Sequence, residues 1–433
     1  MKRGAPRTRP AAARGAGLAE HGVALLREVL LWQFPADSVV SRYFRAHAQL
    51  GQRQRHVLAE TVYAVLRNLR LWRHLAQSAT EGSVELRLLL LGWQGTPQEC
   101  GAAASLLEWR RQALALPCAN LPAALRWSLP DWLAQRLQQS LRPLGETAFE
   151  TLAQALLQPA PLDLRVNLLK ADRQQARQAL DLEGIVSRPT ALSPWGLRVE
   201  GKPALQRSQA FTQGLVEVQD EGSQLLALLL APRRGEMVVD FCAGAGGKTL
   251  ALGAMMRGSG RLYAFDVSQA RLDRLRPRLQ RSGLSNVYPV AIRSERDDRV
   301  QRLAGKIDRV LVDAPCSGVG TLRRNPDLKW RFEEQQLPRL AQQQRSILAQ
   351  AAALLKPGGQ LVYATCSLLE EENTEVVQDF LREHPQWRLL DAGDWWQRQG
   401  LPGAAVGAPY LRLYPHLHGS DGFFAALIER GPA

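Results

Sequence analysis

Strand-like and helix-like segments alternate along the second half of this chain, and that alternation constrains its fold more than any other feature. Because each parallel strand connection needs a crossover, usually a helix, the pattern predicts a doubly wound α/β fold with a mostly parallel sheet, the Rossmann-like architecture. The expected strands are Met237–Phe241, Arg261–Phe265, Val287–Ala291, Arg309–Val312 and Gln360–Ala364, and the expected helices are Leu250–Met256, Gln269–Gln280 and Leu337–Leu355.

Three further regions precede this alternation. The first carries five cations, no acid and much glycine, alanine and proline, which predicts a disordered basic tail. The second has apolar residues at helical spacing, and the third places a helical segment between two strand-like ones. The expected organisation is a tail over residues 1–17, an all-α domain over 18–145, a small α/β module over 146–212 and the doubly wound domain over 213–433.

The charge balance favours a polyanionic partner. Lysine and arginine outnumber aspartate and glutamate by 55 to 41, which gives a net charge of +14. Nearly all of these cations are arginine, which suits bidentate phosphate contacts and base stacking, although a simple bias towards arginine gives the same composition. Apolar runs such as Leu225–Leu230 are far shorter than the roughly 20 residues needed to cross a bilayer, so a cytoplasmic protein is expected.

A glycine-rich segment joins the first expected strand to the first helix. Glycines there let the backbone approach a ligand, and a helix start supplies free N–H groups. About 25 residues later, Asp266 ends the second strand, where an acid can accept the ribose hydroxyls of a nucleoside cofactor. The candidate loop contacts are Asp240, Cys242, Ala243, Gly244, Ala245, Gly246, Gly247 and Lys248.

Two other cofactor sites compete with this interpretation. Gly247, Lys248 and Thr249 resemble the end of a P-loop, but Cys242 stands where the leading glycine is required and Asp266 has no role in such a site. A plain dinucleotide site is also possible, but no hydride-transfer machinery is visible.

Two cysteines lie where apolar strands give way to polar turns. Cys316 follows the strand that ends near Asp313, and Cys366 follows the strand Gln360–Ala364. Thiols at strand exits of a cofactor-bearing sheet indicate covalent catalysis. Cys242 is expected to pack in the core instead. Cys100 and Cys118 fall in the helical region and are not expected to be catalytic. Five widely spaced cysteines without Cys-x-x-Cys pairs predict neither a disulfide framework nor a metal site.

Several segments together resemble the Nop/Sun family of S-adenosylmethionine-dependent RNA cytosine-C5 methyltransferases. The resemblance runs in order over residues 214–429. More loosely, residues 50–55 and 62–67 resemble the NusB-like helical domain of the branch that modifies bacterial small-subunit ribosomal RNA. The matching segments are Asp240–Thr249, Asp313–Gly318, Tyr363–Ser367 with Glu371–Asn373, and Asp421–Phe424, preceded by Val218–Gln224 and by Leu164–Asn167, which is similar to a small RNA-contacting segment.

The resemblance implies S-adenosylmethionine as cofactor and RNA as partner, small-subunit ribosomal RNA first and transfer RNA as an alternative. It implies that Cys366 adds to cytosine C6, that Cys316 assists loss of the C5 proton and product release, and that Asp313 holds or protonates cytosine N3. Lys248 reaches towards the base or Asp313. Reversed thiol roles, as in DNA cytosine methyltransferases, and an inactive RNA-binding assembly factor remain open. A monomer is expected.

Three segments depart from the family pattern, one of which is Glu370 in place of a common proline. Gly244 and Ala245 stand where Ala-Pro is usual. The aspartate that ordinarily binds the adenine amine is replaced by the run Ser294-Glu295-Arg296-Asp297, in which Glu295 aligns best and Asp297 is the alternative. Arg271, Glu295 and Asp313 complete the expected set of cofactor contacts.

Overall fold

The computed structural model describes residues 17–401 and 406–432. The chain divides into two compact units, Met1–Leu129 and Pro130–Ala433. The basic tail expected over residues 1–17 lies outside the described residues, apart from Gly17, which precedes the first helix. In the described part of the chain, no helix is both long enough and apolar enough to cross a membrane.

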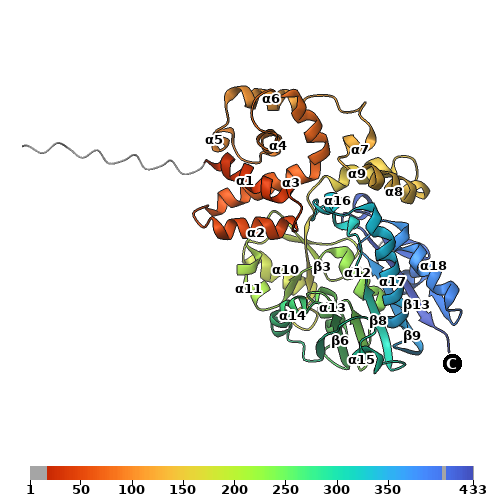
Figure 1. The fold of residues 1–433 in the computed structure, drawn as a ribbon. Helices are drawn as coiled ribbons and strands as arrows, with labels where there is room; N and C mark the ends of the chain where they lie inside the picture. Colours follow the sequence, from red (N-terminus) through yellow and green to blue (C-terminus); the bar gives the residue numbers. More distant parts are fainter. Residues whose placement is uncertain (1–16, 402–405, 433) are drawn as a thin grey trace, which may run out of the picture. The chain divides into compact units, whose positions relative to one another are not determined.

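The described part of the first unit is entirely helical (Figure 1). Helix α4 is its centre, because the run Leu88–Leu91 is buried on every side. Helix α1 approaches α4 so closely that a Cβ on Gly22 would lie 2.7 Å from Leu89 Cδ1. The helices are α1 Leu18–Leu30, α2 Ala36–Ala46, α3 Gln52–Leu75, α4 Val84–Gly92, α5 Pro97–Cys100, α6 Ala104–Leu114 and α7 Ala123–Arg126.

The second unit begins with two helices and a small antiparallel sheet in the order β2-β3-β1-β4. Helix α10 covers this sheet through Ala176 and Leu180, which are fully buried. The expected strand, helix and strand are present, and the sequence pattern missed the short edge strands β2 and β4. The elements are α8 Asp131–Leu141, α9 Ala148–Leu156, β1 Leu162–Val166, α10 Arg173–Leu182, β2 Ser187–Pro189, β3 Gly196–Val199, α11 Gln209–Thr212 and β4 Val216–Val218.

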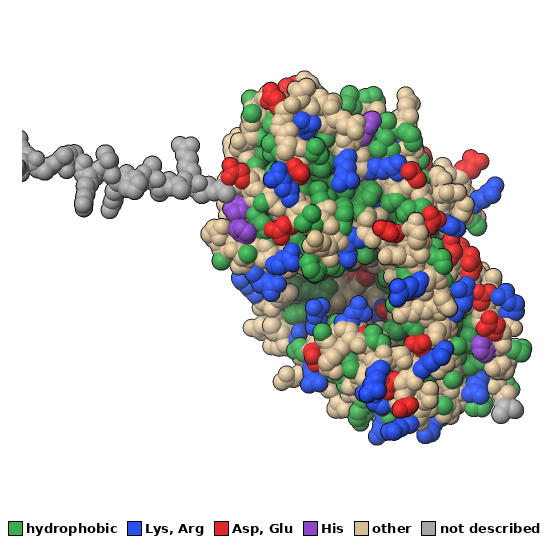
Figure 2. Space-filling model, viewed as in Figure 1, with side chains coloured by type: hydrophobic (Ala, Val, Ile, Leu, Met, Phe, Trp, Pro, Cys, Tyr) green, Lys and Arg blue, Asp and Glu red, His purple; other side chains and the backbone are tan. Residues whose placement is uncertain are grey.

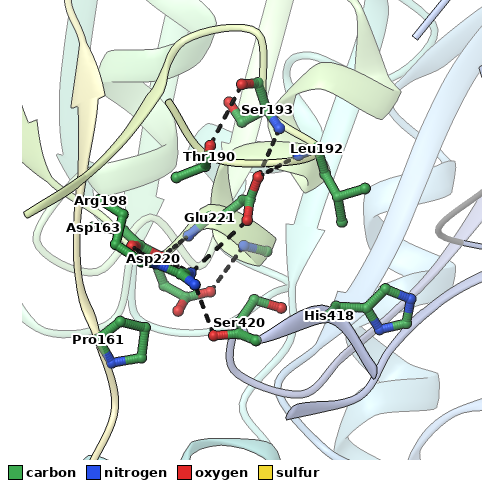
Figure 3. Close-up of polar contacts among 12 residues, drawn as sticks. Pro161, Asp163, Thr190, Leu192, Ser193, Arg198, Asp220, Glu221, His418 and Ser420 are labelled. Atoms are coloured by element: carbon green, nitrogen blue, oxygen red, sulfur yellow. Dashed lines mark hydrogen bonds and ion pairs between the residues drawn. The ribbon is translucent and has the colours of Figure 1, made fainter. Parts of the chain in front are cut away.

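Polar side chains of the small sheet are bonded to the elements that follow it. Asp163 of β1 accepts two hydrogen bonds from Arg198 of β3, at 2.7 and 2.9 Å. Glu221, at the start of helix α12, accepts the backbone N–H groups of Leu192 and Ser193 at 2.6 and 2.8 Å (Figure 3). Both acceptors are buried. The Asp163 bonds join β1 to β3 within the small sheet, and the Glu221 bonds fix the loop before β3 to helix α12, Glu221–Leu230.

The segment that resembles an RNA-contacting stretch is largely directed inward. Asn167 is buried and donates to the carbonyls of Gly214 and Ser282 at 3.0 and 2.9 Å. Arg165 is 2% exposed and donates to the carbonyl of Gly247 at 3.0 Å. These two side chains support neighbouring backbone, and RNA contact by this module stays a prediction for its exposed residues.

A second sheet has the order β11-β12-β13-β9-β8-β5-β6-β7, with β10 paired to β13. The strands from β9 to β7 are parallel, and the strand order reverses between β5 and β8. Such a switch point opens a crevice at the carboxyl ends of the strands. The strands are β5 Met237–Phe241, β6 Arg261–Asp266, β7 Val287–Ala291, β8 Ile307–Asp313, β9 Leu355–Thr365, β10 Trp387–Leu390, β11 Val406–Gly407, β12 Tyr410–Leu413 and β13 Phe423–Arg430.

Helices cover both faces of this sheet (Figure 1). Along β5, Val239 and Phe241 pack in the cluster with α17 and α18, whereas Val238 packs in the cluster with α12 and α13. The predicted doubly wound α/β fold is therefore confirmed. The helices are α12 Glu221–Leu230, α13 Gly247–Met255, α14 Gln269–Ser282, α15 Asp298–Gln301, α16 Leu328–Arg331, α17 Leu337–Ala352, α18 Thr374–Glu383, α19 Ala392–Arg398 and α20 Pro415–His418.

Candidate active site

The glycine-rich loop between β5 and α13 turns sharply at the switch point. Cys242, Gly244 and Gly246 all have positive φ, at 78°, 58° and 83°. A Cβ on Gly246 would lie 2.1 Å from Leu275 Cδ1, so only glycine allows the loop to pack on α14. Gly244 has open space where its Cβ would be, which leaves the loop accessible to a ligand.

Two arginines hold this loop from behind. Arg278 donates to the carbonyl of Ala245 at 2.6 Å, and Arg165 donates to that of Gly247. Glu217 in turn accepts hydrogen bonds from Arg278 and Arg281. Because these carbonyls are engaged, the loop's conformation is fixed before a ligand binds. The sequence reasoning missed both roles, since nothing local marks an arginine that reaches a distant carbonyl.

Two acids at strand ends flank the loop. Asp266 is 3% exposed and accepts hydrogen bonds from the backbone N–H groups of Gly244 and Ser268 at 2.8 and 2.7 Å. Asp240 is fully buried, accepts the Thr249 hydroxyl at 2.6 Å, and burial raises its pKa to about 7. Within the described chain, Asp240 Oδ1 has no hydrogen-bond partner, so this buried oxygen is available to a polar ligand group.

A cavity of about 520 Å³ opens over the loop and both acids. Every predicted site residue except Gly246 lines it, including both thiols. The lining residues that the sequence reasoning did not predict include apolar Val267, Ile292 and Ile347 and polar Ser223 and Gln343. Val267 directly follows Asp266, so its position in the sequence could have pointed to it. Its large apolar side chain is 66% exposed and suits contact with a flat ring.

The two acids that competed for the adenine contact lie in different places. Glu295 lines the cavity, and its Oε1 accepts the Ser346 hydroxyl at 2.6 Å. Asp297 instead caps α15 and binds the Arg299 guanidinium at 2.9 and 2.7 Å. It lines a separate cavity with Arg293 and Arg296. The geometry therefore favours Glu295.

Replacing Glu295 by glutamine is expected to lower the affinity for S-adenosylmethionine about tenfold, because a charge-assisted hydrogen bond to an amine is worth about 1.5–3 kcal/mol. Asp297→Asn is the matched control, since asparagine also caps a helix and this side chain lies outside the cavity. Titration calorimetry measures both. Equal losses in the two variants, or a loss confined to Asp297→Asn, would contradict the assignment.

The two thiols lie in contact at the ends of adjacent parallel strands. Asp313 pairs with Ala364 in the register of β8 and β9, so the turns that follow these strands emerge side by side. The Sγ atoms of Cys316 and Cys366 are 3.3 Å apart. Lys248 Nζ lies 2.7 Å from Asp313 Oδ2 and 5.8 Å from the ring centre of Phe423. The structure thus brings together two thiols, an ammonium group and a carboxylate.

The electrostatic surroundings differ between these groups. The contact with Cys366 and burial together hold the pKa of Cys316 well above its usual value, so Cys316 stays protonated at neutral pH. Burial alone would lower the pKa of Lys248, but the negative charges of Asp313 and ionised Cys366 raise it overall. The Lys248 ammonium lines the same cavity as Cys366. Cys242, whose pKa burial raises, is not placed to ionise.

These features define a class of domain: a doubly wound sheet with a cavity at its switch point and two adjacent thiols in that cavity. The family model described as 16S rRNA methyltransferase RsmB/F matches residues 227–429, and a ferredoxin-like domain of RsmF/B-like methyltransferases matches residues 129–206. The chain belongs to this RsmB/F methyltransferase family.

Individual relatives support the assignment. The chain is 36% identical over 306 residues to a probable ribosomal RNA small subunit methyltransferase B of Synechocystis, covering 70% of this chain and 67% of the relative. The Sodalis glossinidius ribosomal RNA small subunit methyltransferase B is 33% identical, with 95% and 90% covered. Among solved structures, a methyltransferase homologue from Pyrococcus horikoshii superposes with a TM-score of 0.61 at 31% identity, covering 73% of this chain and 100% of that one.

Proposed function

We propose that this protein transfers a methyl group from S-adenosylmethionine to C5 of a cytosine in RNA, with small-subunit ribosomal RNA as the substrate. The observation that carries the proposal is the thiol pair, 3.3 Å apart, in the same cavity as the Lys248–Asp313 ion pair and the glycine-rich loop. The names of the relatives supply the substrate class.

The cavity residues fit the proposed cofactor. The backbone of residues 242–247 would face its amino acid part, Asp266 its ribose hydroxyls and Glu295 its adenine amine, with Val267 and Ile347 against the ring. When bound, the cofactor supplies an electrophilic methyl group. Two features of the cavity match such a ligand: Asp240 Oδ1 has no hydrogen-bond partner within the described residues, and the space beside Gly244 is open.

The two thiols have different proposed roles in the reaction of the cytosine base. Cytosine C5 is a poor nucleophile, but a Cys366 thiolate that adds to C6 turns C5 into an enamine carbon that can attack. Asp313 holds or protonates N3 and so withdraws electrons from the ring during addition. After methylation, Cys316 assists transfer of the C5 proton to solvent; the electron pair of the broken C5–H bond re-forms the C5–C6 double bond and releases Cys366 as a thiolate.

The substrate cytosine must be unpaired or flipped out, because a stacked base cannot present C6 to a thiolate. The net charge of +14 suits a polyanion, and lysine and arginine side chains are spread over the surface shown in Figure 2. We propose that exposed cations of the helical domain and the small module contact phosphates and select the RNA.

Incubating the purified protein with methyl-labelled cofactor and unmodified small-subunit ribosomal RNA is expected to place label on cytosine C5. Nucleoside analysis by mass spectrometry locates the label, and transfer RNA serves as the competing substrate. Label on uridine alone, or no label with either RNA, would reject the proposal. Titration calorimetry with the cofactor alone distinguishes an active enzyme, which should bind the cofactor, from an inactive assembly factor, which should not.

A further inference from the structure

Each of the two cysteines is followed by a serine, and both serines meet one buried carboxylate. The hydroxyls of Ser317 and Ser367 are 3.2 Å apart, and each donates to Glu372 Oε2 at 2.5 Å. On the other oxygen, Oε1, Glu372 accepts the backbone N–H of Ser317 at 2.8 Å and the Gln344 amide at 3.0 Å. One side chain therefore binds the turns of both thiols.

Glu372 is itself held in place. The Tyr363 hydroxyl donates to its backbone carbonyl at 2.7 Å. The adjacent residue, Asn373, accepts the Thr365 hydroxyl at 2.5 Å and donates to the carbonyl of Ser367 at 3.0 Å, on either side of Cys366. Gln344 also donates to the carbonyl of Pro315, directly before Cys316. The carboxylate thus lies at the centre of a network that spans both turns.

Stability alone gives no reason for this arrangement. Glu372 is 0% exposed, and in the part of the chain that the structure describes no cationic side chain pairs with it. Removing a carboxylate from water costs several kcal/mol, and a well-packed apolar residue would often be no less stable. Four converging donors offset part of this cost while fixing the geometry of the groups that donate.

We propose that Glu372 is a positioning residue that fixes Cys316 and Cys366 side by side by binding the serine after each of them. The inference rests on the proposed function for its meaning in catalysis, because one thiol must reach C6 while the other remains near C5. These hydrogen bonds hold the distance between the two thiols. Without the Glu372 carboxylate, the turns that carry Cys316 and Cys366 can move independently.

A dithiol probe tests this geometry without RNA or cofactor. Phenylarsine oxide condenses with two neighbouring thiols, forming two As–S bonds and releasing the oxide oxygen with both thiol protons as water. At a pH where both thiols are protonated this reaction changes no net charge, so its equilibrium reports on the spacing of the sulfurs. The variant Glu372→Met keeps the side-chain length and removes both acceptors.

Glu372→Met is expected to weaken phenylarsine oxide binding about tenfold or more and to lower kcat about 100-fold, with KM for RNA nearly unchanged, because a displacement near 1 Å has effects of this size. Glu372→Gln is expected to restore most of both, since its amide oxygen accepts two donors and its NH2 group can donate to both serine hydroxyls.

Glu371→Met is the matched control, because Glu371 pairs with Arg136 at 2.7 Å and does not contact either serine. The double variant Ser317→Ala/Ser367→Ala also removes both serine hydroxyl contacts and serves as a second test if Glu372→Met fails to fold. It should show the same loss of phenylarsine oxide binding and of kcat. Wild-type arsenical affinity in Glu372→Met or in the folded double variant would overturn the inference. If the variants change phenylarsine oxide binding as expected but the wild-type protein does not methylate cytosine, the proposed function is rejected and the positioning role of Glu372 stands.

Discussion

Replacing Cys366 by alanine is expected to abolish methyl transfer, with a loss of about 10⁴-fold or more, and to remove any covalent protein–RNA complex. The reason is that the proposed bond to C6 has no other donor. Cys316 touches Cys366 but is held protonated, and the Lys248 ammonium lines the same cavity as Cys366. The measurements are label transfer and a denaturing gel that retains covalent complexes.

The other thiol distinguishes the two possible assignments. Cys316→Ala should accumulate a covalent complex, because adduct formation survives while release is slowed. Cys118→Ala is the control: its thiol is free but does not line the cavity, so it should leave trapping unchanged. A complex that persists in Cys366→Ala and disappears in Cys316→Ala would assign the nucleophile to Cys316, as in DNA cytosine methyltransferases.

Replacing Asp313 by asparagine is expected to lower kcat by roughly 10²–10⁴-fold, the usual range for loss of a positioned acid or base. Asparagine keeps the shape of the side chain but can neither protonate N3 nor balance Lys248 Nζ at 2.7 Å. Single-turnover kinetics with saturating RNA and cofactor measure the chemical step directly.

Asp308→Asn is the control for this variant. Asp308 lies at the opposite end of the same strand, pairs with Lys356 and lines no part of the cavity. It should lower stability without changing the single-turnover rate. A normal rate in Asp313→Asn would contradict the proposed role of Asp313 at N3, and a loss of cofactor binding in that variant would assign Asp313 to the cofactor instead.

Local patterns predicted the five parallel strands of the large sheet, β5 to β9, among which β5 and β8 are short apolar runs with mostly buried residues. They did not predict β10 to β13, which complete the sheet. The expected bounds of β5 and β7 match the structure, and α13 begins three residues earlier than expected because the last loop glycine already starts the helix. The edge strands β2 and β4 were missed, since a three-residue strand carries too little periodicity to be recognised.

The sequence by itself determined the doubly wound fold, the glycine-rich loop, the acid that follows β6 and the two thiols at strand exits. These are all set by residues close together in the chain. Only the tertiary structure decided that Glu295 rather than Asp297 reaches the cavity, and that Arg165 supports the loop. It alone showed that Glu372 joins the two cysteine turns. Such contacts join residues far apart in sequence, and the packing of the sheet and its helices fixes which of them meet.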